Sequence, residues 1–193
     1  MKNNFKQFIR QITPISDKEF DETVILFKEI HLEKGDYFVK QGNICRQIAF
    51  INKGTLRMFY LNNKAKETTS CFCLENNLTT SYKSFIQQQP SRLSIKALEL
   101  TELLAINYEN LQKLYDTSVV WQKIGRVFAE REFIVMEQYA SVLNNETAKE
   151  KYLRLLKEQP TVLQKANIED IASLLGITRR TLSRIRQEIS KGI

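Results

Sequence analysis

Arginine and hydroxyl side chains gather near the C-terminus in a pattern that suits contacts with nucleic acid. Guanidinium groups neutralise phosphates and can pair with guanine edges in the major groove, and hydroxyl groups bond phosphate oxygens. From residue 171 onward, five basic residues stand against a single acidic one. The candidates for contact with DNA are Thr178, Arg179, Arg180, Thr181, Ser183 and Arg184.

Two short helices joined by a tight turn must position these side chains. Apolar residues recur at helical spacing from Ile168 to Leu175, and Gly176 suits a turn with positive φ. Thr178 can cap a second helix whose Leu182 and Ile185 face inward. The pattern predicts a helix-turn-helix. The alternative is an ordinary helical hairpin whose exposed face is basic.

The bulk composition bounds the class of protein. A chain of 193 residues, 42% hydrophobic, is long enough for one core and a small second domain. The net charge of +7 favours an anionic partner, either nucleic acid or a membrane surface. Met1 to Ile12 reads as an amphipathic helix and not as a secretion signal, and no run approaches the roughly 20 apolar residues that span a bilayer. We therefore expect a cytoplasmic protein without membrane contact.

The first hundred residues change from helical to β-type patterning. Ser16 and Glu19 form a capping box, which predicts a second helix running to about Ile30. Short β-type runs punctuated by glycine then predict a small antiparallel barrel or jelly roll. These runs are Tyr37–Val39, Ile48–Ile51, Leu56–Tyr60, Thr68–Cys73, Leu93–Ala97 and Leu103–Ile106.

Helical patterning dominates after Asn107, and its longest stretch runs from about Ser118 to Leu143. A helix with two apolar faces can pack on its own barrel with one face and on a partner chain with the other. The alternative is burial of both faces within one subunit. The apolar residues of the two faces are Val120, Ile124, Val127 and Ile134, and Trp121, Phe128, Val135 and Val142.

This order of parts resembles the Crp/Fnr family of bacterial transcription regulators, in which a cyclic-nucleotide-binding-like sensor precedes a terminal helix-turn-helix. The resemblance implies an α+β fold: an antiparallel β-roll or jelly roll with flanking helices, a long dimerisation helix and a small helical domain. The residues that carry the resemblance are Gly42, Ile48 through Gly54 to Arg57, Ala97-Leu-Glu, Leu103-Leu-Ala-Ile106, Ile171-Ala and Thr181-Leu-Ser-Arg184.

The resemblance also implies boundaries and partners. It places a sensor domain at residues 1–116, a dimerisation helix at 117–144 and a DNA-binding domain at 145–193. It implies a homodimer on double-stranded DNA, with half-sites about 34 Å apart in a palindromic operator, and it admits RNA polymerase as a further partner. Arg179 and Arg184 match base-contacting basic positions of the family. Arg180 stands where many members have an acidic residue, which implies a different operator or a phosphate contact.

Cyclic-nucleotide-binding members of the family hold the ribose with a Gly-Glu pair and the phosphate with an Arg-Ser pair. An ungapped count places Thr80 and Ser81 at the first pair and Ser91 and Arg92 at the second. It places Met136 and Glu137 where the family's adenine-contacting hydroxyl pair lies. Neither phosphate-binding nor ribose-binding pair is present, so we expect a degenerate pocket and no control by cyclic AMP. The effector, if one exists, is left open.

The remaining reactive side chains favour no cofactor, metal or catalysis. Three scattered cysteines and one histidine do not supply an iron–sulfur or haem site, and no nucleophile–base set or P-loop is present. We interpret Cys71 and Cys73, which share one face of a strand, as small buried hydrophobes. His31 is expected to be a surface or core residue. We therefore expect no enzyme; a small-molecule-binding or protein-interaction module without DNA binding remains the alternative to a regulator.

Overall fold

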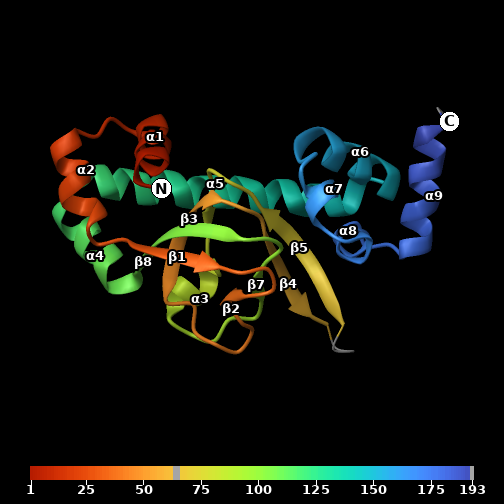
Figure 1. The fold of residues 1–193 in the computed structure, drawn as a ribbon, viewed down its shortest axis with the longest axis horizontal. Coiled ribbons are helices and arrows are strands. Elements are labelled where there is room, and N and C mark those ends of the chain that lie inside the picture. The colour runs from red at the N-terminus through yellow and green to blue at the C-terminus, as the bar shows by residue number, and fades with distance from the viewer. Residues whose placement is uncertain (63–65, 192–193) are drawn as a thin grey trace.

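The computed structural model describes residues 1–62 and 66–191, and the side chains of residues 139–145 lie outside this description. Figure 1 shows two bodies of structure joined along one long helix. The elements run α1 (Lys2–Ile12), α2 (Asp17–Val24), β1 (Lys28–Leu32), β2 (Tyr37–Val39), β3 (Gln47–Lys53), β4 (Leu56–Leu61), β5 (Glu67–Cys73), β6 (Leu78–Thr79), α3 (Tyr82–Gln87), β7 (Ser94–Ala97), β8 (Thr101–Asn107), α4 (Tyr108–Thr117), α5 (Val119–Asn145), α6 (Ala148–Glu158), α7 (Val162–Lys165), α8 (Ile168–Leu174) and α9 (Arg179–Ser190).

Two four-stranded antiparallel sheets form a β-roll. One sheet has the order β1-β8-β3-β6 and the other has the order β2-β7-β4-β5. Inward-facing residues of both sheets fill the space between them, which is the arrangement expected of a small jelly roll. The predicted α+β fold with an antiparallel roll and flanking helices is confirmed, and the six predicted strand runs correspond to β2, β3, β4, β5, β7 and β8.

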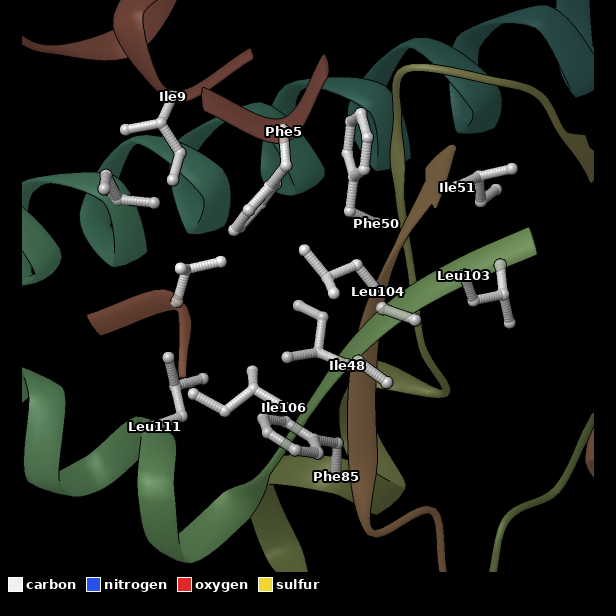
Figure 2. Packing of buried hydrophobic residues seen from close by; sticks show 14 of the residues in the cluster. Phe5, Ile9, Ile48, Phe50, Ile51, Phe85, Leu103, Leu104, Ile106 and Leu111 are labelled. Atoms are coloured by element: carbon white, nitrogen blue, oxygen red, sulfur yellow. The ribbon is translucent and has the colours of Figure 1, made fainter. Parts of the chain in front are cut away.

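Aromatic side chains join the N-terminal helix to the roll and to α5. The ring of Phe5 in α1 lies 5.2 Å from that of Phe50 in β3 and 6.4 Å from that of Trp121 in α5. Figure 2 shows Phe5 and Ile9 of α1 on one side of this core and the strand residues Ile48 and Leu104 below them. The roll and its covering helices therefore share one continuous core.

The predicted extent of the second helix is wrong. That helix ends at Val24, and Lys28–Leu32 forms strand β1, which pairs antiparallel with β8. Phe20 and Val24 do form the buried helical face, but the pairing available along β8 draws the following residues into an extended conformation. Tertiary pairing overrides local helical preference here. His31 lies on this strand and is exposed.

A second hydrophobic core lies near the C-terminus. Tyr152 and Leu155 of α6 pack with Ile171 and Ala172 of α8 and Leu182 of α9. A capping box at Thr147 and Glu150 begins α6, and Asn167 caps α8. We call residues 147–191 the C-terminal helical unit. Figure 1 shows it beside the far end of α5, away from α2 and α4.

The environment of α5 changes along its length. Trp121 and Ile124 near its start are buried against the roll, at 3% and 5% exposure. Four consecutive apolar residues in its second half, from Phe133 to Met136, are each at least half exposed. Four successive residues point around most of the circumference of an α-helix, so this part of α5 is uncovered in the single chain.

Gly54 makes the turn from β3 to β4, where the backbone of Thr101 approaches it closely. Its φ is +100°, and a Cβ there would lie 2.8 Å from Cα of Thr101. Gly42 has a φ of +90° but open space around the same position. We expect Gly42→Ala to lower the free energy of unfolding by about 1 to 3 kcal/mol through backbone strain alone. Gly54→Ala should cost clearly more because the clash is with backbone, and equal losses for the two variants in urea denaturation would contradict this.

Candidate functional site

The turn between α8 and α9 has the local structure that the sequence predicts. Gly176 has a φ of +70°, with no atom within 4 Å of where a Cβ would stand. Thr178 is the N-cap of α9, and its hydroxyl accepts a hydrogen bond from the amide of Thr181 at 3.2 Å. Leu182 and Ile185 are buried against α8 and α6. The turn and the cap thus fix where α9 begins, and its apolar face fixes its rotation about its axis.

Most of the predicted DNA-facing residues lie on the open side of α9. Arg179, Arg180 and Arg184 are exposed, whereas Thr181 and Ser183 are half-buried. The hydroxyls of Thr178 and Thr181 lie 2.9 Å apart at the start of the helix. The structure therefore brings all six predicted residues onto one helix and its cap.

Two of these arginines have carboxylate partners. Arg179 pairs with Glu169 of α8 at 2.8 Å, and Arg184 lies 3.7 Å from Glu188 of its own helix. Both guanidinium groups stay about 70% exposed, at 69% and 72%. Ion pairs in water contribute little stability, so either arginine can exchange its partner for another anion. Arg186 differs, because its guanidinium stacks over the ring of Tyr152 within the C-terminal helical unit.

Helix α8 also contacts the β-roll through an ion pair that the sequence patterns did not reveal. Asp170 of α8 pairs with Arg57 of β4 at 2.9 Å, and both side chains are nearly buried. Burial raises the pKa of Asp170, and the guanidinium of Arg57 partly offsets this rise. Since Arg57 and Asp170 are 113 residues apart by their numbers, no local pattern links them.

Inside the roll, the residues at the two predicted ligand-binding pairs mostly bond to one another or to backbone. The hydroxyls of Ser81 and Ser91 are 2.8 Å apart, and the hydroxyl of Thr80 donates to the carbonyl of Gln47 at 2.9 Å. All three serine and threonine side chains are buried. Arg92 is exposed, so the structure does not bring its guanidinium into the pocket.

Glu132 of α5 is a partly buried carboxyl group that the sequence patterns did not single out. It is half-buried, and burial raises its pKa. Its negative charge acts to raise the pKa of Tyr82 and of the thiols of Cys71 and Cys73. Met136 and Glu137, where the ungapped count placed the adenine contact, are exposed. A carboxylate at Glu132 opposes an anionic ligand by charge.

Cys71 and Cys73, which we expected to be buried, are only partly so. Cys45 is buried, but Cys71 and Cys73 are partly exposed. The Sγ of Cys71 lies 3.9 Å from the thioether sulfur of Met58 on the neighbouring strand.

Within residues 1–62 and 66–191, no group of three or more His, Cys, Asp and Glu side chains is arranged to hold a metal ion. In the same part of the chain, no helix is both long and apolar enough to cross a membrane.

Comparison with known proteins relates the β-roll to the cyclic nucleotide-binding domain. Residues 29–118 match the family model of the cyclic nucleotide-binding domain. This span runs from β1 to the end of α4, so it covers the roll and stops before α5. No curated protein matches the chain.

Solved structures extend the likeness beyond the roll. FixK2 from Bradyrhizobium japonicum matches with a TM-score of 0.74 at 19% identity, covering 86% of each chain. The catabolite activator protein of Thermus thermophilus matches with a TM-score of 0.59 at 20% identity, covering 94% of this chain and 86% of that one. A protein from Eubacterium rectale described as a regulator of the Crp/Fnr family matches with a TM-score of 0.68 at 19% identity, covering 92% and 85%. The chain therefore has the fold of Crp/Fnr regulators.

The pocket chemistry predicts that cyclic AMP does not bind. The hydroxyls of Ser81 and Ser91 are already bonded together, Arg92 is exposed, and Glu132 adds a carboxylate. We expect isothermal titration calorimetry of the full chain to show no saturable heat with cyclic AMP. The Glu132→Gln variant should also fail to bind, because no guanidinium is in place to pair with the phosphate. Saturable binding at low micromolar concentration would contradict the prediction.

Proposed function

We propose that this chain is a sequence-specific, DNA-binding transcription regulator of the Crp/Fnr type, which acts as a homodimer on a palindromic operator and is not controlled by cyclic AMP. The observation that carries the proposal is the exposed arginine side of α9, on a capped helix that follows α8 through a glycine turn. In this proposal α8 and α9 form the helix-turn-helix, with α9 as the recognition helix.

The two hydrophobic cores support a division of the chain into a sensor and a DNA-binding domain. We assign residues 1–116 to the sensor, 117–144 to the dimerisation helix and 145–193 to the DNA-binding domain. The first core holds the roll with α1, α2, α4 and the start of α5, and the second holds α6, α8 and α9. Both cores are contiguous and distinct, which is what two folding units joined by a helix require.

The side chains of α9 suit different parts of a DNA duplex. Arg180 and Arg184 are four residues apart and so share a face of the helix, where bidentate contact with guanine is available to a guanidinium. Arg179 stands at the first helical position beside the cap, where Thr178 also lies. Phosphate oxygens are favoured at a helix N-terminus because the free amides point toward them. We therefore assign Arg184 to base reading and Thr178 to a phosphate, with Arg179 able to reach either.

The uncovered part of α5 supports a homodimer. Phe133 and Met136 are each 71% exposed, and large apolar side chains in such a continuous patch favour association. A two-fold axis along paired α5 helices would bury the same patch of both chains and carry two recognition helices to successive major grooves. The dimer therefore explains both the apolar helix and the expected palindrome.

Substitution of Arg184 tests base reading. We expect Arg184→Ala to weaken binding to the selected operator by about 1 to 3 kcal/mol and to relax the preference at one position of each half-site. The preferred sequence would come from selection among random DNA fragments, and affinities from fluorescence anisotropy at fixed salt. Arg46→Ala removes the same charge from an exposed site of the sensor and should leave the site preference unchanged. Failure of the unmodified protein to enrich any palindrome would count against the proposed function.

Substitution of Phe133 tests the dimer. We expect Phe133→Glu to place a charge in the paired helices and to shift the protein from dimer to monomer in sedimentation velocity at micromolar concentration. Affinity for the operator should fall as well, because a monomer contacts only one half-site. Ile25→Glu introduces the same charge at an equally exposed apolar residue, 73% exposed after α2, and should leave the dimer intact. A monomeric unmodified protein would contradict this assignment.

A further inference from the structure

We infer that Arg57 of the β-roll is a positioning residue for the recognition helix, and that its buried ion pair with Asp170 holds the C-terminal helical unit in a DNA-competent direction. The effect on DNA binding rests on the proposed function. The docking of the C-terminal helical unit on the roll depends only on contacts within the chain.

The guanidinium of Arg57 is held from several sides. Its Nε donates to the hydroxyl of Thr69 at 2.8 Å, and its Nη1 pairs with Glu67 at 2.5 Å and with Asp170 at 2.9 Å. The ring of Phe59 lies 4.5 Å away and covers one face of the guanidinium. The side chain of Arg57 is only 6% exposed. A guanidinium with these partners has a defined position beside α8.

Asp170 is buried, and its carboxylate pairs with Arg57 of the roll. Asn167, not Asp170, caps α8, since its side chain accepts the amide of Asp170 at 2.7 Å. Its carboxylate loses water because the unit meets the roll, and Arg57 is the cation that compensates. The pair therefore depends on docking and not on the folding of either part alone.

A second contact fixes the rotation of α8 on the roll. Strand β5 is at the edge of its sheet, so part of its backbone is open to a further partner. The hydroxyl of Ser173, one turn after Asp170, accepts from the amide of Thr69 at 2.9 Å and donates to the carbonyl of Glu67 at 3.3 Å. Lys165 adds an ion pair with Glu99 at 2.5 Å. Figure 1 shows α8 beside the β4–β5 hairpin.

This docking leaves the DNA side of α9 open. Leu182 of α9 and Ile171 of α8 are completely buried in a shared cluster, so the two helices move as one body. Arg179, Arg180 and Arg184 stay exposed while α8 contacts the roll. The contact is consequently a means of orientation and not an occlusion of the recognition helix.

Orientation matters because a dimer must present two recognition helices at one spacing. A unit that is free to swing must be ordered when it binds, which weakens binding to the operator. It also tolerates half-sites at altered spacing, because each helix can adjust its position. Non-specific binding depends on charge alone and should respond to neither effect.

The test uses the full-length dimer with Arg57→Met and Asp170→Asn, separately and together. Each single variant should weaken binding to the native operator by about fivefold or more, the lower end of typical coupling between sites. The penalty for adding or removing one base pair between half-sites should shrink. Affinity for non-specific DNA should stay unchanged after correction for the altered charge. The double variant should lose no more than the stronger single variant, because both remove the same interaction.

A measurement without DNA separates the docking from the proposed function. Hydrogen exchange at the amide of Thr69, which donates to Ser173, should accelerate in Asp170→Asn while the amides of β3 keep their protection. Asp170→Asn also serves if Arg57→Met does not fold. Unchanged exchange at Thr69 would overturn the docking contact. Faster exchange together with an unaltered spacing penalty on DNA would overturn the positioning role, whereas failure of the unmodified protein to bind DNA would overturn the proposed function alone.

Discussion

The packing of α5 on the β-roll is the constraint on which the rest of the structure depends. Trp121 and Ile124 enter the same core as Phe5 of α1 and Phe50 of β3, so the start of α5 cannot move without opening the core. A helix held firmly at one end carries whatever follows it in a fixed direction. This arrangement places the apolar residues 133–136 outside the roll and the C-terminal helical unit beyond it.

The same helix closes the roll and alters the chemistry of its interior. Glu132 lies one turn beyond Phe128, whose ring makes an edge contact with Tyr82, and partial burial raises the pKa of its carboxyl group. Nearby hydroxyls bond to each other or to backbone. Satisfied hydroxyls and an added carboxylate do not suit a cyclic phosphate, although the surrounding strands have the fold of the cyclic nucleotide-binding domain. Fold and ligand are therefore separable in this chain.

The edge strand β5 connects the two bodies. A sheet edge exposes amides and carbonyls that must be covered or left to water, and here Ser173 covers two of them. Arg57 and Met58 are neighbours on β4 that point to opposite faces of the sheet, one toward Asp170 and the other toward Cys71 inside the roll. The hairpin that borders the interior thus also bears the contact surface for α8.

Local signals allowed the C-terminal helices to be predicted from sequence. The cap at Thr178, the positive φ of Gly176 and the burial of Leu182 each follow from residue types a few positions apart, because capping, turn geometry and helical periodicity act over that range. The strand runs and the N-cap of α2, where the Ser16 side chain accepts from the amide of Glu19, were likewise predictable. Contacts with DNA and between chains remain predictions from those patterns.

Tertiary structure alone decided the features that join distant residues. Strand β1 resembled the end of a helix because its pairing partner, β8, is remote in the sequence; Lys28 pairs with Ala105, which is 77 residues away. Glu132 came to act on the pKa of Tyr82 only when α5 packed on the roll, and Arg57 met Asp170 only when α8 reached the edge of β5. The sequence by itself determined which helices and strands could form and which side of α9 is basic. Their mutual placement depended on the burial of apolar surface and the pairing of charges between elements that are remote along the chain, and no local pattern encodes those interactions.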